Sequence, residues 1–145
     1  SSTALTLSSG DGLKHAYAKF INGAKASSCV SASITLDQTP PSLAVLTPSG
    51  GSSFAENSLI VNGTCSEVNP SAVNINVTLS GVTKRVSCSG GNFSTNFDLT
   101  TLAAGSTPVV LSATDEAGNI KEITSSFNRL VCSIFELPLG SSCVD

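Results

Sequence analysis

The sequence predicts an all-β protein, an antiparallel β-sandwich of about seven strands preceded by part of a second copy, and three observations predict it. The composition suits pleated strands: Thr, Val and Ile are frequent, charged residues make up 12% of the chain, and Met and Trp are absent. Short apolar runs alternate with turn residues at regular spacing. Residues 12–36 also align with residues 105–129 at a constant offset of 93 residues, close to the ~100 residues of one sandwich domain.

The repeat is visible in the hydrophobic positions rather than in identities. Gly12 aligns with Gly105, and Ile34 aligns with Phe127. An offset of this size is too long for a solenoid unit, so it indicates whole modules in tandem. The expected parts are residues 1–37 as the C-terminal strands of a preceding repeat, 38–130 as a complete sandwich, and 131–145 as a disulfide-closed tail.

The first part is expected to hold a short strand, a turn at residues 9–12 and a hairpin. Alternating apolar residues mark both strands of the hairpin and predict one buried face. They are Ala16, Ala18 and Phe20 on the first strand, and Ala32, Ile34 and Leu36 on the return. Pro40 and Pro41 then fix the backbone and predict a stiff connector.

The second part contains seven segments that are typical of strands. The clearest spans residues 73–79, where every second residue is apolar, as in a half-buried strand. Because Trp is absent, we expect Phe93, Phe97 and Phe127 to fill the centre of the core. The seven segments are residues 43–47, 59–65, 73–79, 84–88, 93–97, 109–113 and 120–127.

Five cysteines and a single histidine argue for disulfides rather than a zinc site, because no Cys-x-x-Cys spacing occurs. Disulfides are typical of exported proteins. Cys65 and Cys88 end two strand-like segments in similar surroundings and are predicted to join. Cys132 and Cys143 bracket the tail and are also predicted to be bridged. Cys29 is left without a predicted partner.

Charge and hydropathy exclude two classes of partner. The net charge is −3, and seven Lys and Arg residues are scattered along the chain, so no basic patch for nucleic acid is expected. No apolar run approaches the ~20 residues that cross a bilayer, so no membrane insertion is expected.

Three short motifs resemble the bacterial immunoglobulin-like repeats of surface adhesins and other exported proteins. The resemblance covers residues 38–130 well and residues 5–36 more loosely. It implies an immunoglobulin-like sandwich, an extracellular or cell-surface location, neighbouring repeats as partners and no catalysis. The motifs are Asp37-x-Thr39-Pro40-Pro41, Gly63-Thr64, and Asp115-x-Ala117-Gly118-Asn119 before the last strand.

Four acidic residues form a candidate calcium site, because the loops that carry them are expected at the connector end of the sandwich. Ca²⁺ takes six to eight oxygen ligands, carboxylates among them. Turn chemistry is the alternative, with Asp115 and Asn119 binding nearby backbone and Gly118 supplying a positive φ. No cofactor other than calcium is expected. The four acids are Asp37, Glu67, Asp115 and Glu116.

The tail supplies a candidate ligand-binding surface in Phe135, Leu137 and Leu139, which are apolar and lie between two cysteines. Catalysis is not expected. His15 has Asp11 nearby in sequence, but a triad requires geometry as well as residue types. The acidic residues are also too scattered to form a glycosidase pair.

The sequence therefore predicts a non-catalytic adhesion or spacer module of a bacterial surface or secreted protein. One alternative is a tip that recognises a cell-surface glycan or protein, as a homotrimer or other homo-oligomer, since an incomplete sandwich leaves strand edges open. A second alternative is an accessory module of an exported hydrolase.

Overall fold

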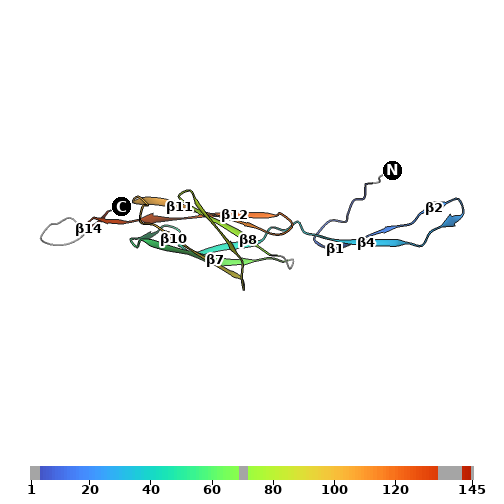
Figure 1. The fold of residues 1–145 in the computed structure, drawn as a ribbon, viewed down its shortest axis with the longest axis horizontal. Coiled ribbons are helices and arrows are strands. Elements are labelled where there is room, and N and C mark those ends of the chain that lie inside the picture. The colour runs from blue at the N-terminus through green and yellow to red at the C-terminus, as the bar shows by residue number, and fades with distance from the viewer. Residues whose placement is uncertain (1–3, 69–71, 134–141, 145) are drawn as a thin grey trace. The chain divides into compact units, whose positions relative to one another are not determined.

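The computed structural model describes residues 4–68, 72–133 and 142–144, and within these ranges the chain forms strands and turns with no helix. The chain divides into two compact units, Ser1–Thr39 and Pro40–Asp145. The all-β prediction is confirmed. Figure 1 labels the strands of both units, and each unit is described here by itself.

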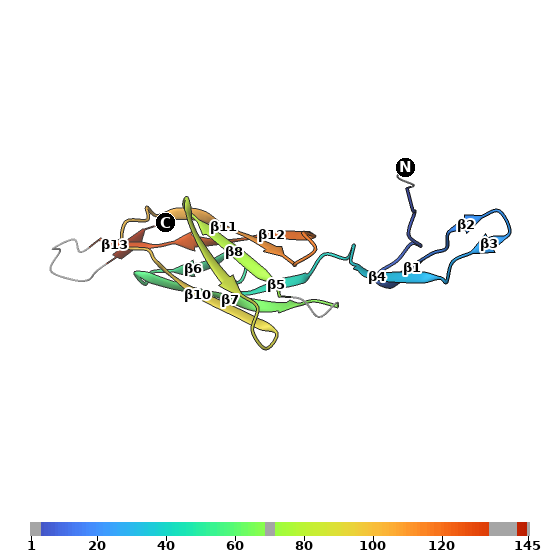
Figure 2. The same ribbon diagram turned by 45° about the vertical axis from the view of Figure 1, so that its right-hand side comes forward.

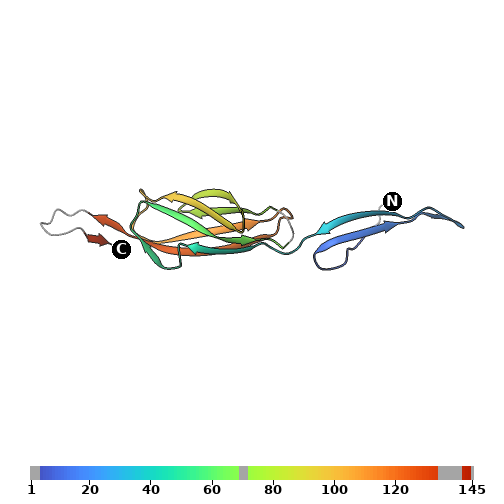
Figure 3. The same cartoon turned by 90° about the horizontal axis from the view of Figure 1, so that it is seen from below.

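The second unit is a β-sandwich of two sheets, which Figures 1 and 3 show as two layers. All neighbouring strands are antiparallel except β6 and β12, which are parallel. One sheet has the order β10 (Asn92–Asp98), β7 (Ser58–Ser66), β5 (Ser42–Thr47). The other has the order β6 (Ser52–Phe54), β12 (Ile120–Arg129), β11 (Gly105–Thr114), β8 (Asn74–Leu79), β9 (Val82–Ser87).

This division of strands is that of an immunoglobulin-like sandwich. The first, second and fifth long strands (β5, β7, β10) form one sheet, and the third, sixth and seventh (β8, β11, β12) belong to the other. The sandwich has eight strands where seven were expected. The additional strand is β6, three residues that follow β5 and pair with β12 of the opposite sheet. Nothing in its short sequence distinguishes it from a loop.

The core lies between the two sheets and is built by strict alternation. Ile75, Val77 and Leu79 point inward from β8, and Val77 pairs with Leu111 of β11. Burying one such side chain contributes roughly 1.5–3 kcal/mol. The prediction that three phenylalanines fill the core is confirmed. The core also contains Leu43, Leu59, Val61, Phe93, Phe97, Leu99, Val109, Ala113 and Phe127.

The first unit is a hairpin, coloured blue in Figure 2. Its strands β1 (Gly12–Ala18) and β4 (Val30–Leu36) are antiparallel, and β2 (Ile21–Asn22) and β3 (Lys25–Ala26) extend it to the turn. The sequence predicted a short strand before residue 9, and the described residues of that segment, 4–8, form none. Of the apolar residues predicted to face a core, Ala16 and Leu36 are half-buried and the other four are exposed, Phe20 to 73%.

The start of the connector is bound to the first unit. The Asp11 carboxylate accepts a hydrogen bond from the Gln38 backbone N–H at 2.8 Å and another from the Thr39 hydroxyl. These bonds, led by that of the Thr39 hydroxyl, hold the pKa of Asp11 below its usual range. The compact first unit accordingly reaches Thr39.

After the sandwich, β13 (Val131–Ser133) and β14 (Ser142–Val144) form a two-stranded antiparallel ribbon. Its backbone register sets Cys132 directly opposite Cys143. Both side chains lie outside the described part, so their disulfide stays a prediction.

Candidate functional site

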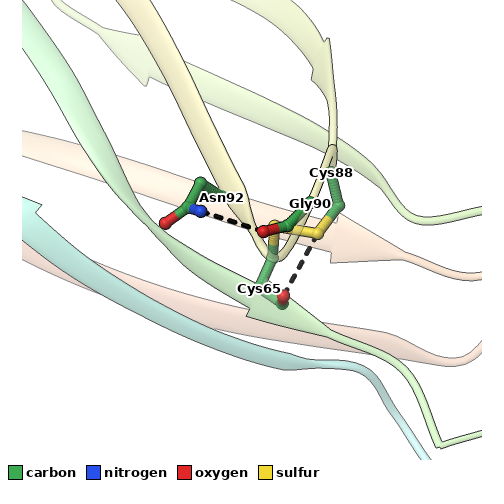
Figure 4. Close-up of a disulfide and its surroundings, with 4 residues drawn as sticks. All are labelled: Cys65, Cys88, Gly90 and Asn92. Atoms are coloured by element: carbon green, nitrogen blue, oxygen red, sulfur yellow. Dashed lines mark hydrogen bonds between the residues drawn. A yellow bond between two sulfur atoms is a disulfide. The ribbon is translucent and has the colours of Figure 1, made fainter.

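The disulfide predicted between Cys65 and Cys88 is present. The S–S distance is 2.06 Å and the Cα atoms are 5.9 Å apart. Cys65 belongs to β7 and Cys88 follows β9, so the bond joins the two sheets (Figure 4). In antibody domains the corresponding bond joins the second strand to the sixth. Here it joins the second long strand, β7, to the residue that follows the fourth long strand, β9.

Hydrogen bonds hold the turn beside this disulfide. The Cys65 N–H donates to the Gly91 carbonyl and the Cys88 N–H to the Val73 carbonyl, each at 3.0 Å. The Asn92 side chain donates to the Gly90 carbonyl at 3.0 Å (Figure 4). Sγ of Cys88 lies 3.2 Å from the Cys65 carbonyl oxygen but has no hydrogen to donate, since it is half of the disulfide. This corner is therefore a structural clamp between the sheets.

The four acids predicted to bind calcium lie outside the strands, in the segments that connect them. Among the described residues, no three carboxylate, histidine or cysteine side chains are grouped so that they could hold a metal ion. Asp37 lies in the first unit and accepts a hydrogen bond from the Thr39 N–H at 3.3 Å. Glu67 accepts one from the Val68 N–H at 2.6 Å. Glu116 is exposed.

Asp115 performs the turn chemistry that was the alternative to calcium. It is 5% exposed, and its carboxylate accepts the Asn119 backbone N–H at 2.8 Å and the Asn119 side-chain amide at 3.0 Å. Gly118 adopts a φ of 90° in the same turn. Burial raises the pKa of Asp115, but the hydrogen bonds from the side chain and backbone of Asn119, with those from Gly118 and Ala117, outweigh it and leave the pKa below its usual range.

Arg129 is a buried charged residue that the sequence analysis missed. It is 3% exposed, and its guanidinium donates to the Glu56 carbonyl at 2.9 Å and to the Asn57 side-chain oxygen at 2.8 Å. These bonds hold the segment between β6 and β7 against the end of β12. The alternation of the strand could have revealed it. Arg129 lies two residues after the core residue Phe127, so its side chain is on the same, inward face of β12.

A hollow in the sandwich is lined by Leu79, Val82, Lys84, Phe97, Asp98 and Leu102, among others. Lys84 donates to the Asn96 carbonyl at 2.5 Å, and its Nζ lies 5.1 Å from the centre of the Phe97 ring. Hydrogen bonds from the backbone and side chain of Thr100 hold the pKa of Asp98 below its usual range. Lys84 and Asp98 therefore both make their contacts within the sandwich itself.

His15 and Tyr17 lie on one face of β1, with ring centroids 6.2 Å apart and an angle of 28° between the planes. Tyr17 is 70% exposed. Asp11, the acid near His15 in sequence, binds Gln38 and Thr39 instead. The stacked rings are therefore an exposed aromatic pair. The predicted ligand-binding residues Phe135, Leu137 and Leu139 lie outside the described residues.

Comparison with a solved mannanase structure supports the fold. No family model matches the chain, and no curated protein matches it. The X-ray structure of the endo-beta-1,4-mannanase from Thermotoga petrophila is similar over 66% of this chain, with a TM-score of 0.56 and 11% identity. An engineered protein is similar over 61%, with a TM-score of 0.44 and 17% identity. The chain spans only 21% of the mannanase and 20% of the engineered protein.

The described part of the chain contains no helix long and apolar enough to cross a membrane. The Cys65–Cys88 disulfide is compatible with an exported protein, because such bonds persist in oxidising compartments.

Proposed function

We propose that the chain is a non-catalytic extracellular module that spaces or presents other parts of a bacterial surface or secreted protein. One observation carries the proposal: the charged and sulfur-containing side chains that stand out in the sandwich act within the fold. Asp115 binds its own turn, Arg129 holds residues 56–57, and the Cys65–Cys88 bond joins the sheets. A module built this way resists separation of its two layers.

The connector adds support for a role as one link of an array. Asp11 binds Gln38 and Thr39 just before the two prolines, so the first residues of the connector are ordered by the unit that precedes them. Pro40 and Pro41 restrict the chain that follows. The resemblance of the connector and of the Asp115–Asn119 turn to bacterial immunoglobulin-like repeats points to the same role.

A recognition module is the second candidate, and the exposed pair of His15 and Tyr17 favours it. Aromatic side chains are common anchors of binding sites, because they bury much area at little cost in conformational entropy. A glycan ring or a protein side chain could stack on these rings.

Binding of the fluorescently labelled chain to a glycan array and to intact cells, with calcium and with chelator, separates the candidates. The spacer proposal expects no saturable binding from a protein that melts cooperatively. Saturable binding would instead favour the recognition module, provided that Tyr17→Ala abolishes it and Thr35→Ala, a control from the facing strand, keeps it. Polysaccharide-hydrolase activity of the full-length polypeptide would place the module in an exported hydrolase.

A further inference from the structure

The hairpin of the first unit has the same strand register as the hairpin β11–β12 of the sandwich. Gly12 lies opposite Leu36, and Gly105 lies opposite Arg129. Both members of the second pair follow their counterparts by 93 residues. The two glycines also share a left-handed backbone, with φ of 107° for Gly12 and 122° for Gly105. Each residue of β1 and β4 therefore has a defined counterpart in the sandwich.

The counterpart face in the sandwich is fully covered. Val109, Leu111 and Ala113 on β11 and Phe127 on β12 are at most 1% exposed, and they pack in the same core as Leu59 and other residues of the opposite sheet. The β11 edge is also paired with β8. This hairpin is stable as part of a sandwich because other strands cover one face and one edge.

The matching face of the first unit is apolar apart from Lys14, which pairs with Ile34, and most of it is exposed although Ala16 is half-buried. Its residues are the counterparts of the four covered ones, and Ile34, which matches Phe127, is 58% exposed. An isolated two-stranded hairpin is marginally stable in water, so such a face favours burial. The matching residues are Ala16, Ala18, Phe20 and Ile34.

We infer that this face and the free edge of β1 dock against strands equivalent to β5, β7, β8 and β10, formed by the polypeptide upstream of residue 1. The order of strands along the chain indicates that the covering strands come from upstream rather than downstream. In the sandwich, the covering strands all precede β11, and β5 begins at Ser42, 63 residues before Gly105. The strands downstream of β4 already cover β11–β12. Upstream residues also approach the correct face, because Ala4 and Leu5 border an apolar groove formed by Ala16, Ala18, Val30 and Ala32.

A second copy of the chain is the competing occupant, since two hairpins could pack face to face. The inference predicts that the chain alone is a monomer whose β1 and β4 amides exchange rapidly with solvent. The extended chain for comparison adds at least 63 upstream residues, the number that separates the start of β5 from the start of β11. In it, the same amides are expected to exchange at least about ten times more slowly, because burial suppresses local opening.

The experiment is hydrogen–deuterium exchange on both chains, with sedimentation to measure their mass. In the extended chain, Ile34→Asp is expected to remove the added protection of β1 and β4. Ser33→Asp, on the opposite face of the same strand, is expected to keep it, and so is Ile34→Val. The melting of the sandwich serves as a folding control in every variant, because its core contains none of these residues.

Equal exchange in the two chains would overturn the inference, and so would a dimer of the shorter chain that Ile34→Asp dissociates. An upstream segment that forms no strands would overturn it as well. Each of these results leaves the non-catalytic role intact, because that role is tested by ligand binding rather than by the assembly of the first unit.

Discussion

The Phe93 ring occupies the space that a side chain at position 63 would need. A Cβ placed on Gly63 would lie 1.9 Å from the Ala44 carbonyl oxygen and 2.7 Å from the nearest Phe93 ring atom. Gly63 pairs with Phe93 on one side and Val45 on the other, at the centre of the three-stranded sheet. The absence of a side chain on Gly63 thus leaves room for the Phe93 ring against β7, which gives a physical reason for the Gly63-Thr64 motif.

Gly63→Ala is therefore expected to destabilise the sandwich. The methyl group meets backbone that cannot move without breaking sheet hydrogen bonds, so we expect a loss of at least about 1–3 kcal/mol, the usual cost of overpacking. Chemical denaturation measures it. Gly50→Ala is the matched control, because nothing lies within 4 Å of a Cβ at that position. Equal unfolding midpoints for the two variants would contradict the close contact.

Removing the clamp between the sheets should cost a similar amount. The disulfide closes a loop with a sequence separation of 23, and the chain-entropy model gives roughly 3 kcal/mol for a loop of this size. We expect the double variant Cys65→Ala, Cys88→Ala to unfold at lower urea concentration and to lose its sensitivity to reductant. Cys29→Ala, which removes an exposed free thiol, should leave the midpoint unchanged. Wild-type protein whose midpoint does not respond to reductant would refute the clamp.

Asp115 should make stability depend on pH in the acid range. Its pKa is lowered in the folded state, so its contribution is present above the unfolded pKa of about 3.9 and is lost as pH falls through the folded value. Asp115→Asn should therefore lower stability at neutral pH and flatten the acid limb of the curve. Thermal melts between neutral and acid pH measure both effects. The exposed neighbour variant Glu116→Gln should melt like wild type at neutral pH, and a D115N curve that parallels wild type would contradict the assignment.

Arg129→Leu should destabilise the sandwich although it places an apolar residue in an apolar strand. The change removes the hydrogen bonds that the buried guanidinium donates to the Glu56 carbonyl and the Asn57 side chain, and hydrogen bonds to a charged group contribute about 1.5–3 kcal/mol. Arg85→Leu on the exposed strand β9 should stay within about 0.5 kcal/mol. Urea unfolding compares the two. An Arg129→Leu variant as stable as wild type would show that the buried guanidinium is not needed to hold residues 56–57.

Calcium is expected to leave the melting temperature unchanged, because the carboxylate of Asp115 is engaged by Asn119 and no three of the described acidic, histidine or cysteine residues are grouped around one point. A ligand that binds the folded state raises its stability as its concentration exceeds the dissociation constant. Melts in calcium and in chelator test this. A calcium-dependent rise that Asp115→Asn abolishes would restore the metal site.

The strands and the core were largely predictable from local pattern. The alternation in residues 73–79 identified β8 because a pleated strand sends every second side chain to one face. The Cys65–Cys88 pair was predictable from matching positions at the ends of two segments. The site was less so. The four acids share their place in loops, and from the sequence Asp115 fitted both a calcium site and a turn; its hydrogen bonds with Asn119 decide for the turn.

The sequence by itself determined which segments form strands, which of their faces is apolar and which cysteines lie at strand ends, since these follow from periodicities of a few residues. Tertiary structure alone decided that β6 pairs in parallel with β12, that the Gly63 backbone lies against Phe93, and that Arg129 is buried on Glu56 and Asn57. The physical reason is distance along the chain: Arg129 and Asn57 are 72 residues apart. The value of such a contact depends on how two sheets pack rather than on any local pattern.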